Sequence, residues 1–124
     1  MKKLTKQEAI ENHRKMWNWI ADETERQTMI VGQGRYFDTF GIEDVPESAC
    51  YCCEYNRQCS EELENQYRCD FCPVDWGENR STCSNLYNEQ GRLVGDGLFE
   101  HWRCTTDWSE AAELAREIAN LPER

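Results

Sequence analysis

The sequence is short of basic residues and has no long apolar run. Its 124 residues include 14 lysines and arginines against 24 aspartates and glutamates, which gives a formal net charge of -10. This surplus of acid repels nucleic-acid phosphates and anionic membranes, and it favours solubility or a basic protein partner. No stretch approaches the ~18–20 consecutive apolar residues that a membrane-spanning helix needs. We therefore expect neither nucleic acid nor a membrane as a partner.

Motifs of catalysis are also missing. The sequence has no G-x-S-x-G elbow, no P-loop, no dinucleotide glycine fingerprint and no H-E-x-x-H zinc motif. Gly95-Asp96-Gly97 is typical of a turn rather than of a phosphate cradle. Because nothing supplies an activated nucleophile or an open metal position, we expect a protein that is not an enzyme.

The N-terminus lacks the pattern of a secretory signal. Residues 1–6 are basic, but a polar helical pattern follows where the apolar segment of a signal would lie. We therefore expect a cytoplasmic protein. Its eight cysteines then favour metal binding, because the cytosol keeps thiols reduced. Disulfides are the alternative if the chain is exported by another route.

Two pairs of cysteines form the most informative pattern. Cys50 and Cys53 are separated by two residues, as are Cys69 and Cys72, and fifteen residues lie between the pairs. This C-x2-C-x15-C-x2-C spacing is typical of a structural zinc site, because each pair on a tight turn directs two thiolates at one ion. We predict zinc bound by these four residues, on two short turns. A site of four sulfurs has no open position for water and is structural.

The other cysteines leave the ligand set open. Cys52 adjoins Cys53 and is an alternative to it or to Cys50, and Cys59 is a further alternative. An irregularly spaced second site is the weaker hypothesis, and its candidates are Cys52, Cys59, Cys83, Cys104 and His101. The competing interpretation is that these cysteines are small apolar residues of the core. An iron–sulfur cluster is the alternative to zinc.

Two terminal helices are predicted. Thr5 to Glu8 has the pattern of a capping box, and apolar residues then recur at spacings of three and four, which predicts an amphipathic helix over 6–28. His13 lies on the apolar stripe and is expected to be a hydrogen-bonded core histidine. A second helix is predicted over 107–121, with Pro122 ending it. Its alanines favour helix and allow close approach to the first helix.

The middle of the chain is predicted to be loop-rich. Residues 50–76 form the expected zinc module, with Ser60 as a candidate helix cap and 60–67 as an exposed loop. Residues 88–91 mark the loop of a short β-hairpin. The predicted fold is one small α-rich, zinc-bound domain over 1–124, in which two terminal helices pack with a loop-rich zinc module of four cysteine ligands. Because a structural zinc contributes ~10–16 kcal/mol to folding, we predict that the middle is unfolded without metal.

Four stretches carry a resemblance that spans nearly the whole chain: residues 11–17 (ENHRKMW), 50–55 (CYCCEY), 72–76 (CPVDW) and 119–124 (ANLPER). In this order they resemble a family of small acidic, cysteine-rich proteins of phages and prophages of Gram-positive bacteria. The resemblance implies a phage origin, the cytoplasm of a bacterial host cell and a paired-cysteine metal centre. It implies no activity, and the shared pattern does not extend to Cys59, Cys83 and Cys104.

Three hypotheses of function follow. The first is a zinc-stabilised phage protein that binds a host protein, for example as an inhibitor of host defence or nucleic-acid processing. Carboxylates that would imitate phosphates in a basic groove are Glu61, Glu62 and Glu64. The second is a zinc-ribbon-like nucleic-acid-binding protein, for which the only bases near the cysteines are Arg57, Arg68 and Arg80. The third is a small-molecule-binding or sequestering protein with a pocket lined by tryptophans.

Overall fold

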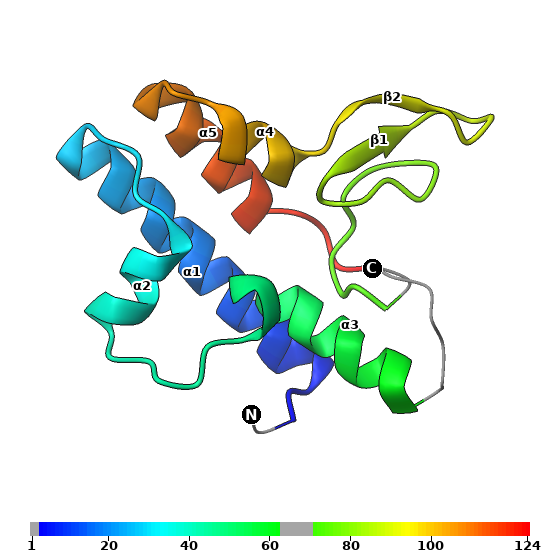
Figure 1. Cartoon of the computed structure of the whole chain (residues 1–124), viewed down its shortest axis with the longest axis horizontal. Coiled ribbons are helices and arrows are strands. Elements are labelled where there is room, and N and C mark those ends of the chain that lie inside the picture. Colours follow the sequence, from blue (N-terminus) through cyan, green and yellow to red (C-terminus); the bar gives the residue numbers. More distant parts are fainter. Residues whose placement is uncertain (1–2, 63–70) are drawn as a thin grey trace.

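The computed structural model describes residues 3–62 and 71–124, and a single long helix organises them. This helix, α1, contacts α5 on one side, α2 on another and α3 beside its first half (Figure 1). A small hairpin extends away from the helices, and α4 packs against α5. The elements in chain order are α1 (Lys6–Gln27), α2 (Gln33–Thr39), a 3-10 turn η1 (Glu47–Ala49), α3 (Tyr51–Glu62), β1 (Asn85–Tyr87), β2 (Leu93–Asp96), α4 (Leu98–Cys104) and α5 (Trp108–Ala119).

The first predicted helix is confirmed, together with its cap. The Glu8 amide donates to the Thr5 hydroxyl at 3.1 Å, and the Thr5 amide donates to the Glu8 carboxylate at 3.0 Å. These two bonds satisfy amides that the first turn leaves without a helical partner. The helix ends where Thr28 takes a left-handed conformation, with φ 49°. Its buried residues follow the predicted spacing of three and four: Ala9, Ile10, His13, Met16, Trp17, Ile20, Ala21 and Thr24.

The second terminal helix, α5, packs on α1 as predicted. Asp107 caps it by accepting the Ser109 amide at 3.2 Å. Fully buried alanines lie in the contact, which lets the two backbones approach closely. On the rim, Arg116 of α5 donates to Asp22 and Glu25 of α1 at 2.8 and 2.9 Å. The pairing of the two terminal helices is therefore the main packing contact of the fold.

The cysteine module is not loop-rich in its first half, and that prediction is wrong. Residues 51–62 form the regular helix α3, so the first cysteine pair begins a helix instead of occupying an isolated turn. The reason is local, because Cys50 acts as a cap: its sulfur accepts the Cys53 amide at 3.4 Å, and its carbonyl accepts the Glu54 amide at 3.0 Å. Ser60 is not a cap either, since it lies inside the helix and donates to the Asn56 carbonyl. The rest of the predicted loop, from residue 63, lies outside the described residues.

The predicted hairpin is confirmed. β1 and β2 pair antiparallel, with Asn85 opposite Asp96 and Leu86 opposite Gly95, and a register irregularity follows before Tyr87. Gly97 then joins the hairpin to α4 in a tight space, because a Cβ there would lie 2.5 Å from the carbonyl oxygens of Thr82 and Cys83. Only glycine fits this position without a backbone shift.

Aromatic side chains fill much of the remaining core. Trp17 of α1 meets Trp102 and Phe99 of α4 at ring-centroid distances of 4.8 and 6.1 Å. Trp19 is partly buried against Tyr36 and Phe40, so it widens the buried face of α1. Within residues 3–62 and 71–124, no helix combines the length and apolar character needed to cross a membrane.

Candidate metal centre

Three of the four predicted zinc ligands lie in the described residues, and they lie in one place. Cys50 immediately precedes α3, Cys53 is in its first turn, and Cys72 comes from the segment that returns to the start of that helix. Cys52, which the sequence offered as an alternative ligand, joins them. The fourth predicted ligand, Cys69, lies outside the described residues. We call Cys50, Cys52, Cys53 and Cys72 the thiol cluster.

The thiol cluster is a row of contacting sulfurs. Cys53 and Cys52 both hydrogen-bond to Cys50, and Cys52 also hydrogen-bonds to Cys72. Half of the row is shielded from water, since Cys52 is 1% exposed and Cys72 is 8% exposed, whereas Cys50 and Cys53 are half-buried. Two distant parts of the chain thus contribute sulfur atoms to one place.

The hydrogen bonds within the row lower the pKa of two thiols and raise the pKa of the other two. The pKa of Cys50 is well below its usual value, because the thiols of Cys52 and Cys53 donate to its sulfur. The pKa of Cys72 falls to about 7, with the bond from Cys52 as the largest cause. The same bonds raise the pKa of Cys52 and of Cys53, which keep their protons. The cluster therefore favours thiolate at two of its sulfurs, the form in which cysteine binds metals.

Further hydrogen-bond donors surround the two thiolates. The indole Nε1–H of Trp76 donates to the Cys72 sulfur at 3.3 Å, and a backbone bond at Val74 lowers the pKa of the same thiol. At Cys50, the Cys53 amide donates a hydrogen bond to the sulfur. Trp76 is buried and covers the Cys72 side of the site. Donors of this kind steady the thiolate ligands of structural metal sites.

The segment that carries Cys72 is held in place from two sides. On the side of α3, the Asn56 side chain accepts the Phe71 amide at 2.7 Å. On the other side the end of the chain pairs with it: Arg124 donates its amide to the Pro73 carbonyl, and the Asp75 amide donates to the Pro122 carbonyl, both at 2.9 Å. These contacts fix Cys72 against Cys52 and explain why two remote cysteines meet.

The donor atoms suit zinc, although they are not gathered around a single point. Within residues 3–62 and 71–124, no group of three or more Cys, His, Asp or Glu side chains is already arranged to hold a metal ion. The thiols contact one another in sequence along a row, whereas a tetrahedral ion needs its ligands at equal distance from one centre. Rotation about the χ1 bond of a cysteine moves its sulfur between three staggered positions. The chemistry of the donor set therefore fits the ion, whereas the present positions of the side chains are not those of a filled site.

The remaining cysteines are spread over the molecule. Cys83 is near enough to the cluster for its charge to raise the pKa of Cys53. Cys104 is exposed and donates to Glu100, and His101 is ion-paired with Glu110 at 3.3 Å. Cys59 is half-buried on α3. No three of the second-site candidates form a metal-binding group in the described part of the chain.

His13 lies near the thiol cluster, which the sequence did not indicate. As predicted, it is a buried, hydrogen-bonded histidine, with its Nε2 2.9 Å from the carbonyl oxygen of Ile118. Its ring meets the Trp76 ring edge-on at 6.1 Å, and it interacts electrostatically with Cys50. Burial lowers the pKa of His13, which keeps the ring neutral. The position follows from the packing of α1 against α5 and α3, for which residue spacing gives no signal.

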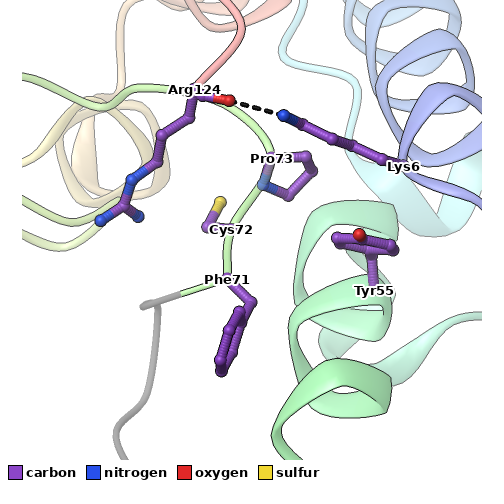
Figure 2. A pocket seen from close by; sticks show the side chains of 6 residues that line it. All are labelled: Lys6, Tyr55, Phe71, Cys72, Pro73 and Arg124. Carbon is purple, nitrogen blue, oxygen red and sulfur yellow. Dashed lines mark hydrogen bonds between the residues drawn. The ribbon is translucent and has the colours of Figure 1, made fainter.

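A small pocket opens beside Cys72 (Figure 2). Its volume is about 210 Å³, and its walls come from the start of α1, from α3 and from the two paired segments: Lys6, Tyr55, Phe71, Cys72, Pro73 and Arg124. The Lys6 ammonium donates to the Arg124 carbonyl at 2.6 Å across one edge. No tryptophan lines this pocket, in contrast to the third functional hypothesis.

Comparisons of the chain with models of protein families, with curated proteins and with solved structures returned no match. The resemblance to phage proteins therefore stays a prediction, and function must be inferred from the residues themselves.

Proposed function

We propose that this is a small zinc-stabilised protein that acts by binding a basic macromolecular partner. Zinc at the thiol cluster would join α3 to the segment around Cys72, and the acidic surface would engage the partner. One observation carries the proposal: four cysteines from two remote parts of the chain lie together, Cys52 and Cys72 buried and Cys50 and Cys53 half-buried, and two of the four favour thiolate.

Zinc is favoured by the chemistry of the donors. Thiolates are soft ligands that select zinc over calcium or magnesium, which prefer oxygen. Two thiolates near one another in a buried site repel, and a divalent cation would offset that repulsion. The amide, indole and backbone donors around Cys50 and Cys72 are the second set of contacts that such a site requires.

The proposed role of the metal is structural. A zinc ion with four protein ligands supplies cross-linking of the chain and leaves no position for a substrate or an activated water. Trp76 and the packing of α3 against α1 cover one side of the cluster. We therefore propose a binding protein, and an enzyme is not part of the proposal.

The charge distribution supports a basic partner. Several arginines are engaged in ion pairs within the molecule: Arg14 with Glu123, Arg26 with Glu23, Arg57 with Glu54 and Glu61, Arg103 with Glu100, and Arg116 with Asp22 and Glu25. Because these arginines are paired with carboxylates of the same molecule, the excess of ten acids gives the surface a negative electrostatic potential. Such a field speeds association with a basic protein and slows association with nucleic acid.

The partner proposed from the family resemblance is a host protein in a bacterial cytoplasm, of the defence or nucleic-acid-processing kind. Of the three carboxylates first considered for phosphate mimicry, Glu61 is paired with Arg57. The side chain of Glu62 and all of Glu64 lie outside what the structure describes. We therefore assign the interaction to the acidic surface as a whole.

Metal analysis of the purified chain tests the first half of the proposal. We expect one zinc ion per chain after purification without added metal, retained through dialysis and released by a strong chelator. A double variant, Cys50→Ser with Cys72→Ser, should lose the metal, whereas Cys104→Ser should keep it because Cys104 is exposed and away from the cluster. A fully folded wild-type chain without metal would contradict the proposal.

Affinity capture from the lysate of a Gram-positive bacterium tests the second half. We expect a basic protein to be retained at low salt and released as ionic strength rises, because screening weakens interactions between exposed charges. Gel-shift measurements with DNA and RNA are the counter-test. A nucleic-acid complex of high affinity, with no protein retained, would favour the zinc-ribbon-like alternative.

A further inference from the structure

The Nδ1 atom of His13 is a buried nitrogen with no hydrogen-bond partner among the described residues. The residue is 0% exposed, so water does not satisfy this atom at the surface. An unsatisfied buried polar atom costs about 1–3 kcal/mol. Native proteins keep few such atoms, and they are frequent where an ion or a ligand belongs.

The hydrogen bond on the other side of the ring determines what Nδ1 offers. A backbone carbonyl only accepts hydrogen bonds, so the proton of the neutral ring must be on Nε2, which faces the Ile118 carbonyl at 2.9 Å. Nδ1 then carries an unshared electron pair. A histidine that donates one ring N–H to a backbone carbonyl and presents the other nitrogen without a proton is arranged as metal-binding histidines are.

One ring contact and one electrostatic interaction place this ring near the thiol cluster. The Trp76 ring packs edge-on against His13 while its Nε1–H donates to the Cys72 sulfur. On the side of α3, His13 and Cys50 interact electrostatically. The imidazole thus packs against Trp76, the hydrogen-bond donor to Cys72, and lies within electrostatic range of Cys50.

We propose that His13 Nδ1 is a direct ligand of the zinc ion, together with three sulfurs of the thiol cluster. The inference rests on the proposed zinc centre and names its fourth ligand. The site becomes one nitrogen and three sulfurs, a common composition for structural zinc, and it is complete without Cys69. It joins α1 to α3 and to the Cys72 segment, so the ion links the terminal-helix pair to the middle of the chain.

X-ray absorption at the zinc edge of the unaltered, zinc-loaded protein tests the ligand set. We expect a mixed shell, with sulfur at about 2.3 Å and one nitrogen at about 2.0–2.1 Å. In parallel, the ¹⁵N resonance of His13 Nδ1 should shift when zinc is added, while that of the exposed His101 should not. A shell of sulfur alone would overturn the assignment of His13 and leave the zinc centre intact. A protein that binds no zinc would overturn the zinc centre itself.

Two substitutions supply an independent comparison. His13→Gln keeps an N–H for the Ile118 carbonyl but removes the ligand, and it should weaken zinc binding by more than about 100-fold, the upper range for residues that only support ligands. Cys69→Ser should change the affinity by less than about twofold. The reverse pattern, with loss in Cys69→Ser and none in His13→Gln, would overturn the proposal. If His13→Gln does not fold, the absorption spectrum of the unaltered protein decides.

Discussion

The indole of Trp76 makes the most specific contact with a cysteine in this molecule. Its Nε1–H donates to the Cys72 sulfur at 3.3 Å, and this bond contributes to a pKa of about 7 for that thiol. Because the bond stabilises the charged form, its removal must raise the pKa. Trp76→Phe keeps most of the aromatic packing and removes only the donor.

We predict that Trp76→Phe raises the pKa of Cys72 above 7, toward the ordinary value of 9.0. The rate of alkylation at Cys72 in metal-free protein, measured against pH and read by mass spectrometry, reports this change. Trp102→Phe is the matched control, since Trp102 is also buried but its Nε1 has no partner among the described residues. Equal profiles for both variants would show that the indole does not affect the thiol.

His13 should make the metal-free protein sensitive to acid. Burial places its folded pKa below the ordinary 6.5, so the unfolded chain takes up a proton that the folded chain excludes. Stability from this residue is therefore complete above about pH 6.5 and decreases as the pH falls below that value. The thermal midpoint of the chelated protein should fall between pH 7 and pH 5.

His13→Gln should lessen that fall, because glutamine does not titrate and retains an N–H for the Ile118 carbonyl. The exposed His101 is present in both proteins, so its contribution cancels in the comparison. If the thermal midpoints of the two proteins depend on pH in the same way, the pKa of His13 is not lowered by folding.

At this scale the sequence predicted three of the cysteines that the structure brings together, and it gave no sign that His13 lies near them. The C-x2-C spacing identified Cys50 and Cys53, and Cys72 also lies where they meet. The sequence also offered Cys52 as an alternative to Cys50 or Cys53. It could not decide among the three, because neighbouring residues can each face inward. The position of His13 near the cluster depends on the packing of three elements, and residue spacing contains no information about such packing.

Among the elements, the junction of the hairpin with α4 tolerates the least change. Gly97→Ala would place a Cβ 2.5 Å from two backbone oxygens, which cannot move as a side chain can. We predict a loss of about 3 kcal/mol or more in the free energy of unfolding, the range of severe overpacking. Chemical denaturation measures it.

Gly95→Ala is the matched control for that experiment. It lies two residues away in β2, and a Cβ there meets nothing within 4 Å. Its stability should change by less than about 1 kcal/mol, the range of ordinary strand preferences. A similar loss in both variants would attribute the effect to the loss of glycine flexibility and not to the contact.

Predictability differed among the elements for a physical reason. α1 and α5 have long apolar stripes and standard side-chain caps, so periodicity and capping identified them. α3 is capped by a cysteine, and its buried face includes Cys52, Glu54 and Gln58. Those residues interrupt the expected apolar pattern, and the cysteines indicated a turn. The helix exists because burial against α1 and the cap at Cys50 outweigh the weak pattern.

For the molecule as a whole, metal removal should destabilise one region and leave another nearly unchanged. The α1–α5 contact is built mainly from apolar residues and does not depend on the thiols, whereas the Cys72 segment meets α3 through the bond between Cys52 and Cys72 and through the Asn56 side chain. We predict that chelation greatly accelerates hydrogen exchange in residues 51–62 and 71–76 and changes α1 and α5 much less. Readdition of zinc is the control. Uniform acceleration, or none, would contradict this division.

The paired ends of the fold have one practical consequence. The last residues of the chain, Pro122 to Arg124, pair with the segment from Pro73 to Asp75 and so lie next to the sulfurs. A paramagnetic ion bound at the cysteines would therefore broaden the magnetic resonance signals of this tail. The tail is thus a natural reporter of whether the centre is filled, although nearly fifty positions along the sequence separate it from Cys72.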